Sequence, residues 1–126
     1  MTVLWRRALV CLALLPFAAV ASHAESARAS SVSREAIARG VRRNVRAIRV
    51  CYERALIRDP SAAGTVTVQF VIGRDGPVLS ASISATTIQD TEMLDCLVSH
   101  ARRWRFPPNP EGDVTVRFPF VFAPSS

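Results

Sequence analysis

The sequence predicts a small α+β domain with the element order α-β-β-α-β, in which two helices pack on one face of a three-stranded sheet. Two stretches, 34–58 and 90–104, carry apolar residues at helical spacing. Three others, 64–72, 78–87 and 114–122, alternate residue types as half-buried strands do. Elements in this order indicate one layer of helices over one sheet.

The first 24 residues have the pattern of a secretory signal peptide. Arg6 and Arg7 precede an apolar run, 8–21, and small residues follow it up to Ala24. The run has 14 residues, fewer than the roughly 20 that cross a bilayer, so we expect cleavage after Ala24 and export to the periplasm. If the segment is retained, the protein is anchored in the membrane instead.

Removal of this segment leaves 102 residues, which suffice for one small domain and not for two. Arg6 and Arg7 are lost with it, so fourteen Arg face ten acidic residues and the net charge falls from +6 to +4. Residues 25–33 are small, polar and aperiodic, which predicts a disordered leader. The domain is then expected at 34–123, with a short tail at 124–126.

The first helix is expected over residues 34–58, with Ser33 as its N-cap and Asp59-Pro60 as its stop. Gly40 loosens the first turns, so the part from Val41 onward is the better helix former. One face of this helix is apolar and comprises Ile37, Val41, Val45, Ile48, Tyr52 and Leu56. The other face, called the basic face below, comprises Arg39, Arg42, Arg46 and Arg49.

The first two strands are expected to form a hairpin, because Gly73-Arg74-Asp75-Gly76 has the composition of a turn. In strand 64–72 the residues expected to face the core are Val66, Val68, Phe70 and Ile72. In strand 78–87 we expect an inner face of Leu79, Ala81 and Ile83, and a solvent face of Ser80, Ser82 and Ser84.

The second helix is expected to begin after Asp90, an N-cap residue. Its apolar stripe comprises Met93, Leu94, Leu97, Val98, Ala101 and Trp104. Pro107, Pro108 and Pro110 then exclude further helix, and Gly112 permits a turn. The last strand, 114–122, has one apolar face made of Val114, Val116, Phe118, Phe120 and Phe122.

Cys51 and Cys96 are the cysteines that remain after export, and two cysteines in an exported domain predict one disulfide between them. A metal site is the alternative, because His100 follows Cys96 by four residues on the same helical face. Zinc sites usually show tighter pairs such as C-x-x-C, so we favour the disulfide and expect no metal and no other cofactor.

The basic face is the main charge feature, because residues 34–58 carry eight Arg against Glu35 and Glu53. A charged face on an amphipathic helix is most often solvated. Alternatively, it binds an anionic polymer, a lipid surface or an acidic protein. We do not expect nucleic acid as a partner, because export separates the protein from it and because the aromatic residues alternate on a core-facing strand.

No catalytic constellation is recognisable, so we predict no enzymatic activity. His100 is the single histidine after residue 24, and no serine lies in a G-x-S-x-G elbow. Asp90, Glu92 and Asp95 share a helix start, where they serve capping and solvation. Neither cysteine has the C-x-x-C neighbour of a redox site.

Several motifs resemble the C-terminal domain of the TonB energy-transducer family. They are Leu94-Asp95, the run W-R-F-P-P from Trp104, the Val/Phe-rich last strand, and the hairpin G-x-V-x-V-x-F-x-I from Gly64 with D-G-x-V from Asp75. Three further features are similar to the AgmX/PglI C-terminal branch, which is associated with gliding motility and envelope complexes: C-Y-E-R-A-L from Cys51, Cys96, and F-P-F-V-F from Phe118.

The resemblance implies a non-enzymatic periplasmic interaction module of an envelope, transport or gliding-motility assembly. Domains of the TonB family accept an extended segment of an outer-membrane partner as an added strand at an open sheet edge. By position, the implied edge is the last strand, with Val114, Val116, Phe118, Phe120 and Phe122. Pro119 makes this strand a poorer template for an added strand, because proline has no backbone N–H to donate. The alternative is that Pro119 prevents pairing and the protein is a structural accessory subunit, of undefined oligomeric state.

Overall fold

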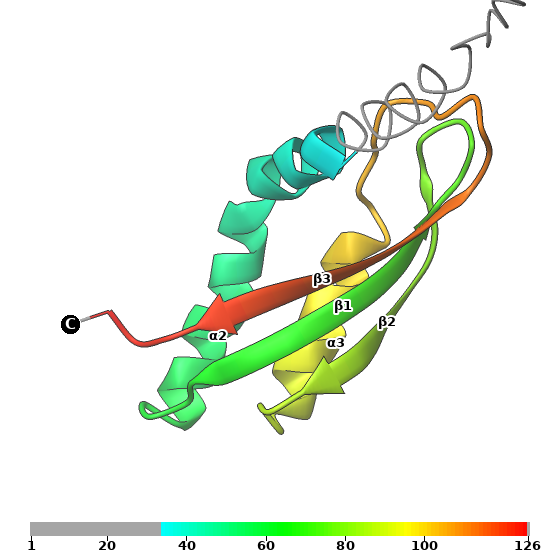
Figure 1. Ribbon diagram of the computed structural model, residues 1–126. Helices are drawn as coiled ribbons and strands as arrows, with labels where there is room; N and C mark the ends of the chain where they lie inside the picture. The colour runs from blue at the N-terminus through cyan, green and yellow to red at the C-terminus, as the bar shows by residue number, and fades with distance from the viewer. Residues whose placement is uncertain (1–33, 126) are drawn as a thin grey trace, which may run out of the picture.

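The computed structural model describes residues 34–125, which form one antiparallel sheet with helices on one of its faces (Figure 1). The strands are β1 (Gly64–Ile72), β2 (Val78–Thr86) and β3 (Val114–Phe122), and the helices are α2 (Val45–Arg58) and α3 (Thr91–Ala101). The strand order is β2-β1-β3, so the first strand of the chain lies in the middle. The predicted α+β class and element order are confirmed, whereas the predicted signal peptide and leader lie outside the described residues.

The predicted first helix is interrupted at Asn44. Residues 34–43 are helical, Asn44 has φ −105° and ψ 3°, and α2 begins at the next residue. The Asn44 side-chain amide donates to the Gly40 carbonyl at 2.8 Å, and its backbone N–H donates to the Val41 carbonyl at 3.0 Å. The side chain thus satisfies a carbonyl that a break in the helix would otherwise leave without a donor. The two helical segments take different directions as a result (Figure 1).

Gly40, the expected weak point, is helical and has a packing role. A Cβ at this position would lie 2.5 Å from Cε1 of Phe106, so the missing side chain admits the Phe106 ring against the helix. On its other side, the Phe106 ring stacks on Phe70 of β1 at a centroid distance of 5.7 Å. Gly40 therefore allows the first helical segment to reach the core of the sheet.

The β1–β2 hairpin has the predicted turn, in which the Gly76 N–H donates to the Gly73 carbonyl at 2.8 Å. The pairing register shifts twice along β2, because Leu79 and Ser84 have no partner on β1. Such extra residues are β-bulges. The prediction that Leu79 faces the core is wrong: it is 60% exposed, because the bulge turns it out of the alternation.

The segment after α3 explains the W-R-F-P-P motif. The helix ends at Ala101, so Trp104 lies beyond it, although this residue is buried as its apolar character predicts. Arg105 forms an isolated bridge with Pro77, the Phe106 N–H donates to the Gly76 carbonyl at 2.8 Å, and the Val78 N–H donates to the Trp104 carbonyl at 3.3 Å. Trp104 and Phe106 thus point inward and Arg105 outward, as in a short strand.

The core lies between the sheet and the helices. Its fully buried members include Ile48, Val66, Val68, Phe70, Met93 and Leu97. β3 contributes Phe120 and Phe122, while its alternate residues are exposed, which matches the predicted apolar face. No helix within residues 34–125 combines the length and the hydrophobicity required to span a membrane.

Candidate functional site

β2 and β3 form the two edges of the sheet, and they differ in regularity. β3 pairs with β1 from Val114 to Phe122 without a register shift, whereas β2 contains two bulges. Bulges bend a strand and disturb the row of backbone groups that another strand would need. Within residues 34–125, no further strand pairs with the outer side of β3. The β3 edge is therefore the better template for an added strand.

Hydrogen bonds of Thr65 establish which backbone groups of β3 face outward. The Thr65 N–H donates to Thr87 Oγ1 at 2.9 Å, and the Thr65 carbonyl accepts from the Thr87 N–H at 3.0 Å, so Thr65 faces β2. Backbone direction alternates along an antiparallel strand, so Val66 faces β3. Val66 pairs with Phe120, and Thr65 pairs with Val121. The β3 residues whose N–H and carbonyl face away from the sheet are consequently Thr115, Arg117, Pro119 and Val121.

The residues predicted from the sequence for the partner edge belong to this strand, but they occupy its inner positions. Val114, Val116, Phe118, Phe120 and Phe122 direct their backbone groups to β1. An added strand would instead bond to the N–H groups of Thr115, Arg117 and Val121, and to the carbonyls of these residues and of Pro119. Pro119 lies among the outward positions, so its missing N–H leaves the β1 ladder intact and interrupts only the free edge.

A cavity of about 230 Å³ that is partly open to solvent lies between α2 and the C-terminal end of β3. α2 lines it with Val45, Ile48, Arg49 and Tyr52, and the strand lines it with residues 120–123. Ile48 and Tyr52 are buried, whereas Val45 is 40% exposed. The Tyr52 ring packs on Phe122 with a centroid distance of 5.0 Å, and its hydroxyl donates to the Ala62 carbonyl. The cavity is thus mainly apolar, with one guanidinium in its wall.

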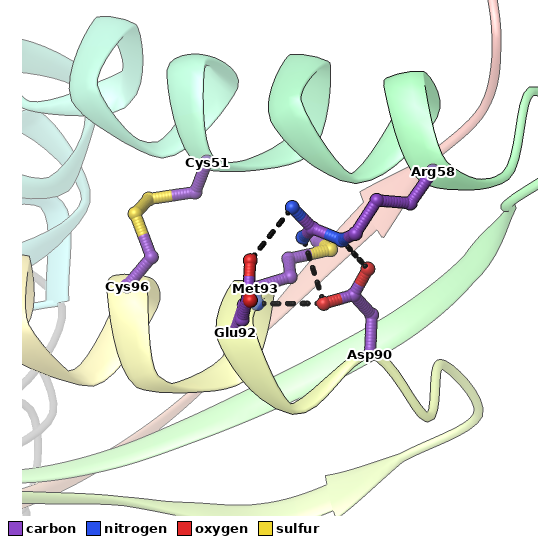
Figure 2. Close-up of a disulfide and its surroundings, with 6 residues drawn as sticks. All are labelled: Cys51, Arg58, Asp90, Glu92, Met93 and Cys96. Carbon is purple, nitrogen blue, oxygen red and sulfur yellow. Dashed lines mark hydrogen bonds and ion pairs between the residues drawn. A yellow bond between two sulfur atoms is a disulfide. The ribbon is translucent and has the colours of Figure 1, made fainter.

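Two tethers hold α2 against α3 (Figure 2). The first is the predicted disulfide between Cys51 and Cys96, with a Cα–Cα distance of 5.8 Å. The second is Arg58, the last residue of α2, which donates from Nε and Nη2 to the two carboxylate oxygens of Asp90 at 2.9 and 2.8 Å. Its Nη1 also lies 2.8 Å from Oε2 of Glu92. These tethers fix the α2 wall of the cavity relative to the rest of the domain.

Asp90 connects this ion-pair cluster to the start of α3. Its Oδ1 accepts the Met93 N–H at 3.0 Å, which confirms the predicted N-cap. The hydrogen bonds from Arg58, and then the one from the Met93 N–H, lower the pKa of the Asp90 carboxyl below its usual value. In return, the hydrogen bond to Asp90 raises the pKa of Arg58. A cation at the end of α2 and carboxylates at the start of α3 also suit both helix dipoles.

The alternative of a metal site involves the same disulfide. Sγ of Cys51, Sγ of Cys96 and a ring nitrogen of His100 lie within 4.8 Å of one another. Thiolates are the form in which cysteine binds zinc. While the two sulfur atoms are bonded to each other, neither is a thiolate, so this state of the protein offers zinc only the imidazole.

The basic face is divided by the break at Asn44. Arg39 and Arg42 lie on the segment 34–43, whereas Arg46 and Arg49 lie on α2. Nη1 of Arg39 lies 3.7 Å from Oε2 of Glu35. Both side chains are exposed, so this ion pair contributes little to the stability of the fold. No carboxylate of residues 34–125 forms an ion pair with the other members, Arg42, Arg46 and Arg49.

Sequence reasoning missed the Arg58 cluster and the cavity. Arg58 is separated from Asp90 by 32 positions, and the sequence indicates only that it ends a helix. A usable signal was present, since a basic last turn of one helix and an acidic first turn of the next attract each other when the helices are antiparallel neighbours. The cavity has no such signal, because it depends on how the end of β3 crosses α2.

The domain is thus a helix-backed, three-stranded antiparallel sheet with one regular free edge, β3. The family model described as Gram-negative bacterial TonB protein C-terminal matches residues 58–124. The chain therefore belongs to the TonB C-terminal family, whose members are periplasmic protein-interaction modules of the envelope. The match begins at the last residue of α2, so most of this helix, Cys51 included, lies outside the matched residues.

The chain is also similar to a solved structure, the NMR solution structure of the C-terminal domain of TonB from Helicobacter pylori. The sequence identity is 20%, the TM-score is 0.42, and the similarity covers 65% of this chain and 81% of that chain. No curated protein matches the chain.

Proposed function

We propose that the protein is a non-enzymatic module that binds an envelope protein by accepting an extended segment of it as an added strand beside β3. The observation that carries this proposal is the regular pairing of β3 with β1, which directs the N–H groups of Thr115, Arg117 and Val121 outward. Main-chain bonds along such an edge supply affinity that depends little on the sequence of the partner.

The proposal includes export by a signal peptide cleaved after Ala24, followed by a leader at 25–33 and a domain at 34–123. The Cys51–Cys96 disulfide supports an oxidising compartment. We further assign the chain to the AgmX/PglI branch, because C-Y-E from Cys51, the second cysteine and F-P-F-V-F from Phe118 accompany the TonB-type motifs. The process served is then an envelope, transport or gliding-motility assembly.

Photo-crosslinking in the living cell tests the choice of edge. A photoreactive phenylalanine analogue placed at Thr115 or Val121 of β3 should capture a partner on irradiation. The same analogue at Ser80 or Ser82, which are exposed on the bulged β2 edge, should capture none. Capture from β2 alone would refute the assignment of the binding edge.

Hydrogen exchange of the purified complex tests the mode of binding, because alternation predicts a specific pattern. The amides of Thr115, Arg117 and Val121 should gain protection when the captured partner is added. The amides of Val116 and Phe120 already face β1, so their slow exchange should change little. Equal protection of both sets, or of neither, would contradict strand addition.

The second candidate function is binding of an anionic polymer or lipid surface, and one observation favours it. Arg42, Arg46 and Arg49 have no ion-pair partner among the described residues. Replacing all three by Glu should abolish such binding, and the affinity of the wild type should fall steeply with ionic strength. Strand addition should instead survive both changes at reduced affinity. If neither the β3 edge nor the basic face binds a partner, the remaining hypothesis is that the protein is a structural accessory subunit.

A further inference from the structure

We propose that Cys51, Cys96 and His100 form a Zn²⁺ site that opens when the disulfide between the two cysteines is reduced. In the oxidised protein the disulfide joins α2 to α3. In the reduced protein, one Zn²⁺ ion held by both thiolates and the imidazole takes over this connection. The inference does not depend on strand addition at β3, because all three residues lie on the helices.

The three ligand groups are already gathered at one place between the helices. Sγ of Cys51, Sγ of Cys96 and a ring nitrogen of His100 lie within 4.8 Å of one another. Around tetrahedral Zn²⁺, sulfur and nitrogen ligand atoms lie about 3.5–3.8 Å apart. Once the sulfur atoms are no longer bonded to each other, rotation of the two cysteine side chains can provide this spacing. The helices then have to move little, since the Cα atoms of the two cysteines are 5.8 Å apart.

Cys96 and His100 have the spacing of a ligand pair on a helix. They are four residues apart on α3 and therefore share a face. The same spacing brings the two histidines of the H-E-x-x-H motif to one zinc ion. Cys51 on α2 lies opposite Cys96 and supplies the third ligand (Figure 2). His100 belongs to the last turn of α3, where the helix dipole favours positive charge.

Water is the ligand available at the fourth position of the site. Cys51 is 1% exposed, whereas Cys96 and His100 are half-buried, so the site reaches solvent on the α3 side. Glu92 precedes Cys96 by one helical turn, but its carboxylate is 2.8 Å from the Arg58 guanidinium. Three protein ligands with one open position are found in accessible zinc sites. We therefore expect the ion to exchange with solution.

The reductant that the site requires is an external dithiol, which acts by thiol–disulfide exchange. One of its thiolates attacks Sγ of the half-buried Cys96, breaks the bond to Cys51 and releases the Cys51 thiolate. The second thiolate of the reductant then attacks the reductant's own sulfur in this mixed disulfide, which releases the Cys96 thiolate and leaves the reductant as a disulfide. Two electrons pass to the protein, and Zn²⁺ binds the two thiolates in place of two protons.

The site combines residues from inside and outside the family match. The match begins at residue 58, so it includes Cys96 and His100 but not Cys51. The third ligand thus comes from a helix that lies almost wholly outside the matched residues. Zn²⁺ at this position would hold α2 on the domain while the disulfide is open.

Cobalt substitution tests the site, because Co²⁺ bound by thiolates is coloured and Zn²⁺ displaces it. The full-length protein is purified without a histidine tag in a Cys11→Ser background, in which Cys51 and Cys96 are the remaining cysteines. After reduction by a phosphine in the absence of air, it should bind one Co²⁺ per chain with the sulfur-to-cobalt charge-transfer band of two thiolates. The oxidised protein should show no such band, and Zn²⁺ should remove the band from the reduced protein.

Variants of α3 separate coordination from a structural role of the histidine. His100→Ala should weaken Zn²⁺ binding about 100-fold or more, since loss of an outer-shell partner alone costs about 10–100-fold. Ser99→Ala changes the exposed neighbour of His100 and should bind as the wild type does. His100→Cys should restore tight binding, with the charge-transfer intensity of three thiolates.

The coupling between zinc and the disulfide can be measured in a thiol–disulfide buffer of fixed composition, with alkylation and mass spectrometry as the readout. Free Zn²⁺ at 100 times its Kd should raise the ratio of reduced to oxidised protein about 100-fold, because the ion binds the reduced form. At the same zinc concentration, the ratio for His100→Ala should rise only about twofold.

Three results would overturn the inference. Reduced protein may bind no more Co²⁺ than oxidised protein, it may bind Co²⁺ equally well without His100, or it may bind one ion per two chains, which would assign the thiolates to a site between molecules. Far-ultraviolet circular dichroism shows whether the reduced protein is folded. If reduction unfolds it, Zn²⁺ should refold the wild type and not His100→Ala, and a reduced wild type that Zn²⁺ does not refold would equally exclude the site.

Discussion

Reduction of the Cys51–Cys96 bond is expected to lower the free energy of unfolding by about 4 kcal/mol. The bond joins residues separated by 45 positions, and the chain-entropy model assigns a loop of this length about 4 kcal/mol. Small domains are stable by about 5–15 kcal/mol, so the reduced protein should remain folded with a narrow margin. For a domain of this size the loss corresponds to a decrease in Tm of roughly 15–30 °C.

Urea denaturation of oxidised and phosphine-reduced protein, followed by Trp104 fluorescence, measures this difference. Reduction retains both sulfur atoms, so the comparison isolates the crosslink from the packing of the core. Cys51 is 1% exposed, so the Cys51→Ala/Cys96→Ala variant should be less stable than the reduced wild type by the cost of the lost volume. The double variant should also be insensitive to the reductant. A reduced protein within about 1 kcal/mol of the oxidised form would refute the entropic reasoning.

Three further predictions concern the ion pair between Arg58 and Asp90, the turn between β1 and β2, and the free edge of β3. Arg58 holds the pKa of Asp90 in the folded protein below its usual 3.8. The ionised Asp90 therefore stabilises the folded state fully above pH 3.8, and this stabilisation is lost as the pH falls through the lower pKa of the folded state. In urea titrations at different pH, the Asp90→Asn variant should lose less of its free energy of unfolding on acidification than the wild type, whereas the Asp95→Asn variant should lose as much as the wild type. Gly76→Ala should cost about 2 kcal/mol or more, because φ is +106° and a Cβ would overlap the Phe106 carbonyl. Gly112→Ala, with φ +116° and open space around it, should cost only about 1 kcal/mol, and equal losses would contradict the close approach. Pro119→Thr adds an outward N–H to β3 and should promote self-association in sedimentation experiments; an unchanged monomer fraction would show that Pro119 does not protect the edge.

The elements that follow a strict period could be predicted from the sequence nearly to the residue. β1 and β3 span the predicted ranges, because an uninterrupted alternation leaves one register that buries the apolar face. The failures occur where a local geometry breaks the period. Leu79 is exposed because a bulge adds a residue to β2, and the helix break falls at Asn44, not at Gly40, because a side-chain amide stabilises it there.

The candidate site could be predicted only in part, for a related reason. An edge strand follows from the family resemblance, but the outward direction of its odd-numbered amides depends on the pairing of Thr65 with Thr87. The cavity depends on the placement of α2 against the end of β3, which is established by contacts between residues far apart in the sequence. Composition and spacing carry no information on such contacts.

Reduction of the disulfide should also show whether α2 contributes to the β3 edge. β3 pairs with β1 through main-chain bonds, whereas Cys51–Cys96 and Arg58–Asp90 hold α2 in place. Reduced protein kept folded at low temperature should therefore still bind the captured partner and retain the protection of the Thr115, Arg117 and Val121 amides.

Loss of this protection on reduction would mean that the β3 edge itself depends on α2, through Tyr52 and Phe122, whose rings are 5.0 Å apart. The residues that match the family model, which begin at Arg58, would then not suffice for binding.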